Sequence, residues 1–228
     1  MQQQGAMMVV CSKINPGKEK EYHEWYDEHV NIMFSYPGIE RVSRNRCTRP
    51  LGDSADNSPE YITLYELKEK ADLENYFNSS QMDAAKKQFE ETWEGLGDVL
   101  WSGFYEPLHV LKRGPLTGDK RFMEIAGAGP KPGKEKEYLD YYVGHFTNMF
   151  EYTGIREVSY VRMFMPMAQD GKNHDYVTVY DFESEAAMNA FYDDPVFTGG
   201  RKDWEEIGQP AMDLLFAACY ESVTALQR

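Results

Sequence analysis

The chain contains one segment written twice, and this repeat limits its fold more than any other feature. Residues 16–43 and 132–159 align at a fixed offset of 116, and 16 of the 28 aligned positions are identical. A further match, at an offset of 115, repeats a Tyr-x-Thr-x-Tyr pattern at 61–65 and 176–180. Such long matches indicate two copies of a unit of about 110 residues, the size of a small domain rather than of a solenoid turn.

Each copy predicts the element order strand, helix, strand, strand, helix, strand. Turn signals at 15–17 and 37–38 bound the first helix, and alternating apolar residues mark the strands. In the first copy we expect strands at 6–14, 39–48, 61–67 and 101–110, and helical segments at 18–36 and 71–93, the latter broken near 78–80. The second copy repeats this order from 121 to 225.

This order predicts an α+β fold of two ferredoxin-like βαββαβ repeats. Each repeat places two helices on one face of a four-stranded antiparallel sheet. The other face needs cover, which the second copy supplies. We therefore expect an intramolecular pseudo-dimeric α/β barrel, with two sheets facing each other and the helices outside. Residues 1–111 are the first repeat, 112–120 a short linker containing Gly and Pro, and 121–228 the second repeat.

Composition and charge argue against several classes of protein. The net charge of −14 opposes binding to nucleic acid or an anionic membrane, because phosphate would be repelled. The chain lacks an apolar run near the roughly 20 residues that span a bilayer, and its N-terminus lacks signal-peptide features. Three widely spaced cysteines without a CxxC pair favour reduced thiols. We expect a cytoplasmic monomer with an internal pseudo-dimer, or a homodimer of it.

The run Trp-Tyr-Asp-Glu-His at 25–29, followed by Pro-Gly-Ile at 37–39, resembles the dimeric α/β-barrel superfamily, especially its EthD-like members. The resemblance spans both copies and so implies a tandem-duplicated member whose units pair sheet to sheet. The superfamily includes cofactor-free monooxygenases, isomerases, cyclases, lyases, haem proteins and members without known chemistry, so the resemblance does not name a reaction. The second copy departs from the run, with Val143 and Gly144 before His145.

Histidines in the two repeated helices are the candidate catalytic residues. Helical spacing predicts a stripe facing the sheet, made of Tyr22, Tyr26, His29 and Met33 in the first copy and of Tyr138, Tyr142, His145 and Met149 in the second. An imidazole with a pKa near about 6.5 suits a general acid or base. The alternative is a core histidine bonded to a tyrosine or a backbone carbonyl. We assign catalysis to His29 and His145. A neighbouring carboxylate, Asp27 or Glu28, could orient the imidazole of His29, whereas His145 has no such neighbour in the sequence.

Tyrosine hydroxyls on the strands are expected to complete each site. Tyr65 and Tyr180 would donate hydrogen bonds to a developing enolate or phenolate, as an oxyanion hole does. The predicted substrate-binding residues are Tyr26, Met33, Arg46, Tyr61, Tyr142 and Tyr176. The simpler explanations are that tyrosine is a good strand former and that Arg46 pairs with a surface carboxylate.

Motifs for a metal or an organic cofactor are missing from the sequence. It contains no Gly-rich phosphate loop, serine nucleophile elbow or HExxH run, and we interpret His109 and His174 as incidental. We therefore predict a cofactor-independent lyase, isomerase or cyclase acting on a small aromatic or polyketide-like substrate. The rival enzyme class is a cofactor-free monooxygenase. Two further hypotheses are a haem-binding barrel with a histidine axial ligand and a ligand-binding barrel without turnover.

Overall fold

The structure, a computed structural model, describes residues 5–114, 120–168, 172 and 174–228. The expected linker at 112–120 lies largely outside these described residues, which omit 115–119. We call residues 5–114 the first half and 120–228 the second half. The first half contains β1 (Ala6–Ile14), α1 (Glu19–Phe34), β2 (Ile39–Pro50), the 3₁₀ turns η1 (Gly52–Asn57) and η2 (Lys70–Asp72), β3 (Tyr61–Leu67), α2 (Leu73–Phe77), α3 (Ser80–Thr92) and β4 (Gly97–Lys112).

The second half follows the same order with more helical pieces near its end. It contains β5 (Phe122–Pro130), α4 (Glu135–Met149), β6 (Ile155–Ala168), β7 (Tyr176–Phe182), α5 (Glu185–Phe191), α6 (Pro195–Asp203), the π-helical turn η3 (Trp204–Gly208), α7 (Gln209–Ala211) and β8 (Met212–Gln227). Within the described residues, no helix has the combined length and apolar character needed to cross a bilayer.

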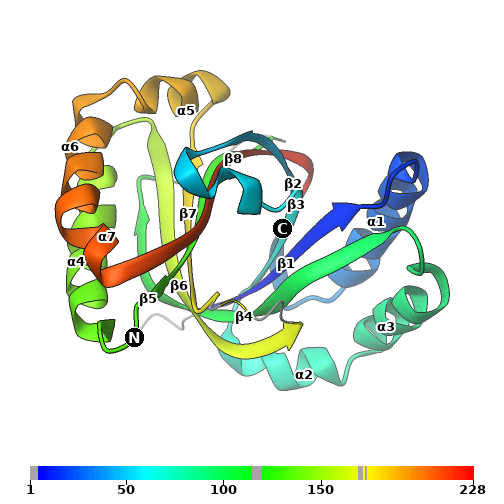
Figure 1. Cartoon of the computed structure of the whole chain (residues 1–228). Helices are drawn as coiled ribbons and strands as arrows, with labels where there is room; N and C mark the ends of the chain where they lie inside the picture. Colours follow the sequence, from blue (N-terminus) through cyan, green and yellow to red (C-terminus); the bar gives the residue numbers. More distant parts are fainter. Residues whose placement is uncertain (1–4, 115–119, 169–171, 173) are drawn as a thin grey trace.

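The strands form a closed antiparallel barrel in the order β1-β3-β2-β8-β5-β7-β6-β4 (Figure 1). The order β4-β1-β3-β2 in the first half is matched by β8-β5-β7-β6 in the second. The halves join along two edges, where β2 pairs with β8 and β4 pairs with β6. The two expected sheets therefore do more than face each other. Their edges are hydrogen-bonded, so the barrel has no open sheet edge.

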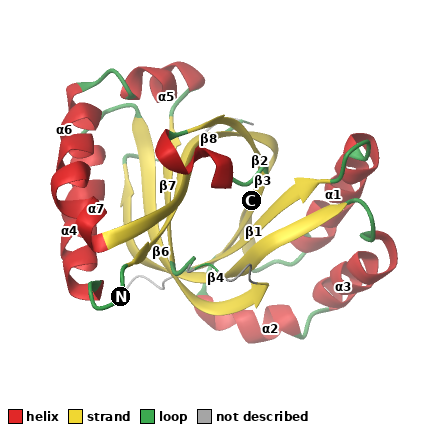
Figure 2. Cartoon of the chain, viewed as in Figure 1, coloured by secondary structure: helices red, strands yellow, loops and turns green. Residues whose placement is uncertain are grey.

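Helices cover the barrel in two groups, α1–α3 on the first half and α4–α6 on the second (Figure 2). Because strand side chains alternate, each strand serves two layers. Met8 and Tyr65 point outward into the cluster beneath α1, whereas Val9 and Leu64 belong to the cluster inside the barrel. The described residues thus form three apolar clusters, one under the helices of each half and one in the barrel interior.

Helix starts follow from local sequence. The Ser79 hydroxyl accepts a hydrogen bond from the Met82 backbone N–H and caps α3, which accounts for the break predicted near 78–80. Ser184 and Asp194 cap α5 and α6 in the same way, and Pro195 occupies the first turn of α6. Gly17 provides the positive φ of 77° in the turn before α1.

One end of the barrel interior is filled by ion pairs. Arg121 donates to both carboxylate oxygens of Asp181, at 2.8 and 2.7 Å. Arg41 pairs with Glu66 at 2.5 Å and with Glu157 at 3.4 Å. Burial alone would raise the pKa of Glu66, but Arg41 and Arg121 together hold that pKa below its usual value. These residues form a charged plug, and the charges within it compensate one another.

Candidate functional site

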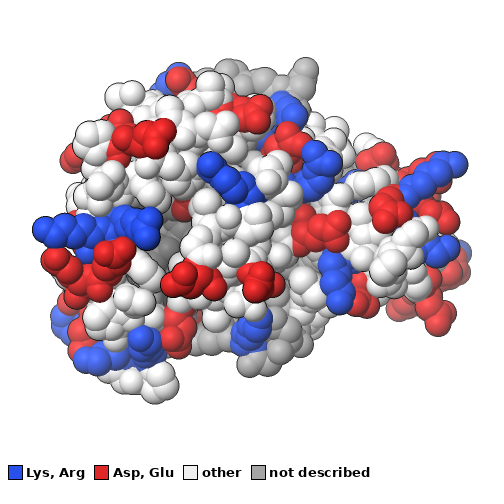
Figure 3. Space-filling model, turned by 45° about the horizontal axis from the view of Figure 1, so that its top comes forward, with Lys and Arg blue, Asp and Glu red and all other residues white. Residues whose placement is uncertain are grey.

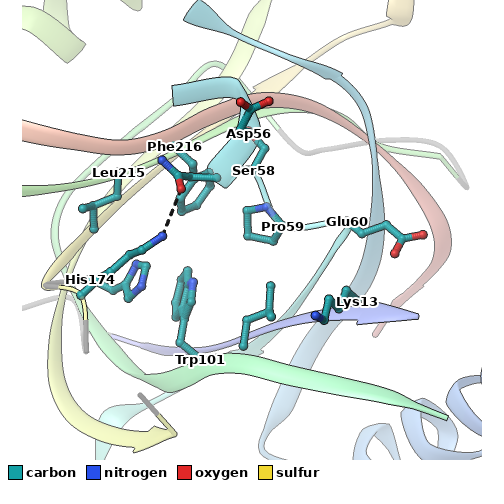
Figure 4. A pocket seen from close by; sticks show the side chains of 12 residues that line it. Lys13, Asp56, Ser58, Pro59, Glu60, Trp101, His174, Leu215 and Phe216 are labelled. Atoms are coloured by element: carbon teal, nitrogen blue, oxygen red, sulfur yellow. Dashed lines mark hydrogen bonds between the residues drawn. The ribbon is translucent and has the colours of Figure 1, made fainter. Parts of the chain in front are cut away.

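A cavity of about 430 Å³ lies at the end of the barrel away from the charged plug (Figure 4). Glu60, which precedes β3, lines this cavity, whereas Glu66 of the plug lies near the other end of the same strand. Both halves contribute to the cavity wall, with Trp101 from β4 and Phe216 from β8. We call this region the barrel mouth.

The barrel mouth contains an imidazole stacked on an indole. The ring centroids of Trp101 and His174 are 4.2 Å apart, and the ring planes are inclined by 17°. The Phe216 ring lies 6.2 Å from that of Trp101. Figure 4 shows His174 and Trp101 side by side in the cavity wall, with Phe216 across from them. The arrangement combines apolar ring surface with one group capable of proton transfer at neutral pH.

Two buried tyrosines fix the backbone at the mouth. Tyr105 of β4 donates its hydroxyl hydrogen to the carbonyl oxygen of His174 at 2.8 Å. Tyr220 of β8 donates in the same way to the carbonyl oxygen of Pro59 at 3.1 Å. Each bond runs from one half to the other, so the two halves hold each other's mouth segments. The backbone that carries the His174 imidazole is therefore positioned from inside the barrel.

Charged and polar groups surround the apolar wall. Lys13 forms an ion pair with Asp98 at 3.1 Å, and the Glu60 carboxylate accepts the Ile14 backbone N–H at 3.1 Å. Lys172 donates to the Asn57 side-chain oxygen at 3.2 Å. Acidic and basic side chains are also interspersed over the face shown in Figure 3. The rim thus offers both signs of charge to the polar groups of a ligand.

The site residues predicted in the first half lie outside the barrel, between the sheet and its helices. The buried cluster there includes Tyr26, Met33, Tyr61 and Tyr65. His29 stacks on Trp25 with 4.4 Å between ring centroids, and its Nδ1 lies 2.9 Å from the Gln88 side-chain oxygen. Burial lowers the pKa of His29 to about 4. Its imidazole is therefore neutral at pH 7 and is packed between α1 and α3.

The second half places its predicted residues in the equivalent layer. Its buried cluster includes Tyr142, Tyr176 and Tyr180. His145 stacks on Tyr141 with 5.2 Å between centroids, and its Nδ1 lies 3.0 Å from the Tyr141 hydroxyl. Burial lowers the pKa of His145 to about 4. The structure therefore gathers the predicted residues into two separate sets, one per helix layer, and neither set lines the barrel mouth.

Burial also raises the pKa of the tyrosines predicted to act as oxyanion donors. Tyr65 and Tyr180 both have pKa values well above the usual value, and desolvation is the main cause. Their hydroxyls therefore remain protonated. A protonated phenol can donate a hydrogen bond but does not take up a proton.

Two charged groups near the predicted sites pair with other residues. The Asp27 carboxylate lies 3.6 Å from Arg44, a guanidinium that is 1% exposed, so this carboxylate serves an arginine and not the His29 imidazole. Arg46 pairs with Glu221 at 2.6 Å across the β2–β8 ladder. This ion pair agrees with the simpler of the two explanations given for Arg46, that it pairs with a carboxylate of the protein instead of a substrate. Among the described residues, the His, Cys, Asp and Glu side chains form no group of three able to hold a metal ion.

Sequence reasoning missed the barrel mouth, although the repeat contains a signal for it. Trp101 and Phe216 are separated by the repeat offset of 115, as are Pro59 and His174. The mouth is therefore lined at positions that the repeat offset relates to each other. Pro59 in one half corresponds to His174 in the other, and this difference places an imidazole beside the apolar rings of Trp101 and Phe216.

Comparison with known proteins supports the barrel architecture. No protein-family model and no curated protein matches the chain. The solved structure of an anthrone oxidase-like protein matches with a TM-score of 0.61 and 13% identity, over 99% of this chain and 93% of that one. A proposed monooxygenase from Fusobacterium nucleatum matches with a TM-score of 0.63 and 10% identity, over 100% and 99%. A haem-binding protein from Thermus thermophilus matches with a TM-score of 0.52 and 10% identity, over 99% and 92%.

These matches cover nearly the whole chain at low sequence identity. They therefore show the fold and leave the activity to be argued from the site. The chain has an α+β fold with an antiparallel barrel of the dimeric α/β-barrel type, an architecture shared by proteins described as oxidase-like, monooxygenase-like and haem-binding.

Proposed function

We propose that the chain binds a small planar aromatic molecule at the barrel mouth and moves a proton on it with His174. The observation that supports this proposal best is the Trp101–His174 stack in the wall of a cavity of about 430 Å³. Cavities of this size suit small molecules, and indole and phenyl surfaces favour flat apolar rings. The reaction class is lyase, isomerase or cyclase chemistry of an aromatic or polyketide-like compound, without a metal or organic cofactor.

The chemistry begins with removal of a proton next to a carbonyl and ends with its return. The neutral His174 imidazole takes a hydrogen as H⁺ from the carbon beside the carbonyl, and the electron pair of the broken C–H bond forms an enolate. The imidazolium then returns a proton to another position or to a leaving group. Lys13 and Lys172 on the rim supply positive charge for the enolate oxygen. The Tyr105 hydrogen bond to the His174 carbonyl orients the segment that carries the base.

The catalytic roles predicted for His29, His145, Tyr65 and Tyr180 remain a second proposal for the same chemistry, in the helix layers. We prefer the mouth, because His29 and His145 are stacked, hydrogen-bonded and made weakly basic by burial. A haem-binding barrel would use a histidine as axial ligand. The His145 ring does not fit this role as it stands, because Tyr141 stacks on it and the Tyr141 hydroxyl lies 3.0 Å from its Nδ1.

We also infer that the barrel is an internal pseudo-dimer of two repeats, 1–111 and 121–228. This inference is supported by the matching strand orders of the two halves and by the equivalent bonds from Tyr105 and Tyr220. Because both free sheet edges of each half are used within one chain, we expect a monomer with no need of a second copy. Three widely spaced cysteines without a CxxC pair agree with a location in the cytoplasm.

The test uses α-tetralone, a largely planar aromatic ketone with acidic α-hydrogens. Saturation-transfer NMR measures its binding, and ¹H NMR in D₂O measures exchange of its α-hydrogens. We expect Trp101→Leu to weaken binding, and His174→Gln to keep binding but slow exchange by about 10²-fold. The matched control His29→Gln should keep both properties.

Three results would redirect the proposal. Loss of exchange in His29→Gln with full exchange in His174→Gln would place the reaction in the helix layer. Binding without any exchange by the wild type would favour a ligand-binding barrel. Turnover that stops under argon would favour a monooxygenase.

A further inference from the structure

Four neighbouring positions outside the barrel wall differ completely in chemistry between the two halves. Under the helices of the first half these positions are Met8, Phe77, Phe104 and Met165, the last of which comes from β6 of the second half. Under the helices of the second half they are Glu124, Tyr192, Cys219 and Arg49, the last of which comes from β2 of the first half. The strand pairings confirm the equivalence, because Phe104 pairs with Met8 and Met165 as Cys219 pairs with Glu124 and Arg49. An apolar group of four is thus replaced by a polar one.

The polar group forms a continuous chain of contacts. The Tyr192 hydroxyl donates to the Glu124 carboxylate at 2.6 Å and lies 3.1 Å from the Cys219 sulfur. Arg49 donates to the same sulfur at 3.3 Å, and its guanidinium carbon lies 4.4 Å from the centroid of the Tyr192 ring. Because Tyr192 uses its one hydrogen on Glu124, the Cys219 thiol is the donor to the Tyr192 oxygen.

Packing alone does not require this polar group. The layer under α1–α3 fills the equivalent volume with methionine and phenylalanine, and Phe77 packs on Phe104 with 5.3 Å between ring centroids. A carboxyl and a guanidinium cost free energy to desolvate, and apolar residues of similar volume are often as stable or more so. A polar group held where an apolar one packs well is a candidate functional site.

The polar group is also reachable from solvent. Arg49 is exposed, and Glu124 and Tyr192 are half-buried even though Glu124 lies in the middle of β5. Phe197 of α6 packs edge-on against Tyr192 with 4.8 Å between ring centroids, and it is also half-buried. A cation, a phenol and an accessible aromatic surface therefore lie together on the helix-covered side of the second half.

We propose that Arg49, Tyr192 and Phe197 form a second binding site, which takes a small aromatic carboxylate. A guanidinium has five N–H donors and binds a carboxylate through two of them, more than its contact with Cys219 occupies. The ligand ring packs on Phe197, and a cation–π contact with the Tyr192 ring holds the Arg49 guanidinium in place. This site lies outside the barrel wall and does not depend on the function proposed for the mouth.

Glu124 gives the site a pH dependence that a purely structural group would not have. Burial raises the pKa of Glu124, and its neighbours are Tyr142 of α4, Tyr180 of β7, Tyr192, Cys219 and Arg49. Of these groups only Arg49 is charged at neutral pH. An ionised Glu124 repels a bound carboxylate, so binding should tighten as the pH falls through the raised pKa of Glu124 and this group takes up a proton.

Benzoate is the probe, and isothermal titration calorimetry on the full chain measures its dissociation constant. We expect Arg49→Met, which installs the residue type found at the equivalent position, Met165, to weaken binding by about tenfold or more. The matched control is Arg46→Met, which removes another arginine of β2 whose partner is Glu221. This control should bind benzoate as the wild type does. Glu124→Gln should keep binding but remove its pH dependence.

Several outcomes would overturn the proposal. It fails if the wild type takes up no benzoate, or if Arg49→Met binds as tightly as Arg46→Met. It also fails if the pH dependence survives in Glu124→Gln. Because His174→Gln should leave Arg49-dependent binding intact, loss of benzoate binding in that variant would assign the binding to the mouth instead. Circular dichroism of every variant confirms that the fold is kept.

Discussion

The Tyr105 hydroxyl lies 2.8 Å from the carbonyl oxygen of His174 and joins the wall of one half to the mouth segment of the other. An equivalent bond joins Tyr220 to Pro59 at 3.1 Å. Both tyrosines are fully buried, so neither carbonyl has easy access to water as a replacement partner. The two bonds therefore stabilise the barrel and the mouth together.

Removal of either hydroxyl should lower the stability of the fold, but only one of the two removals should also affect the proposed activity. We expect Tyr105→Phe and Tyr220→Phe each to lower the free energy of unfolding by about 1–3 kcal/mol, because each leaves a buried carbonyl oxygen without its hydrogen bond. Only Tyr105→Phe should also slow the exchange of the α-tetralone hydrogens, because Tyr105 holds the segment of His174. Tyr220 holds Pro59, which has no group that takes part in proton transfer. Urea denaturation and NMR exchange measure the two effects. Equal loss of exchange in both variants would contradict the special role of His174.

The size of the mouth should depend on a glycine behind Phe216. A Cβ atom on Gly127 would lie 2.3 Å from a ring carbon of Phe216, so Gly127→Ala forces that ring toward the cavity. We expect destabilisation of about 1–3 kcal/mol and weaker α-tetralone binding. Gly144→Ala is the matched control, because a Cβ there meets no atom within 4 Å. Undiminished ligand binding in Gly127→Ala would show that Phe216 does not shape the site.

Much of the fold could be predicted from the sequence because it is written in local patterns. The strands predicted at 6–14 and 61–67 coincide with β1 and β3, and the helix predicted at 18–36 is α1 with its ends shortened. The strand predicted at 101–110 extends to Gly97–Lys112. Its first residues, Gly and Asp, are typical of turns, and only pairing with β1 in the barrel makes them strand.

The location of the mouth could not be predicted in the same way. The partner that makes His174 notable, Trp101, comes from the other half of the chain, and their contact depends on closure of the barrel. By contrast, His29 and His145 stand out because they belong to the repeated helix. A sequence repeat identifies residues that the two segments share. In the helix layers these shared residues include a buried histidine stacked on an aromatic ring. The two sites that we propose lie at positions where the two halves differ.

The two buried histidines should make the fold sensitive to acid. Burial lowers the pKa of both His29 and His145 to about 4, whereas an unfolded histidine titrates near about 6.5. Between these values the unfolded chain binds more protons than the folded one, so the free energy of unfolding falls as the pH drops from 6.5 to 4. Each histidine contributes up to about 1.4 kcal/mol per pH unit in this window.

Urea denaturation at several pH values measures this effect. We expect His29→Gln and His145→Gln each to flatten the dependence on pH in this window, with no change in slope above pH 7. A slope that both variants share with the wild type would mean that these imidazoles accept protons freely in the folded state. That result would also revive them as acid–base catalysts.

The charged plug should contribute far more to stability than ion pairs on the surface. Arg121 and Asp181 are 6% and 3% exposed and share two hydrogen bonds, whereas the Arg46 side chain in the pair with Glu221 is 52% exposed. Asp181→Asn leaves Arg121 buried with its charge uncompensated on that side, which should cost about 3–5 kcal/mol. Arg46→Met should cost about 1 kcal/mol or less. Similar costs in urea denaturation would mean that water reaches the plug and screens it as it screens the surface pair.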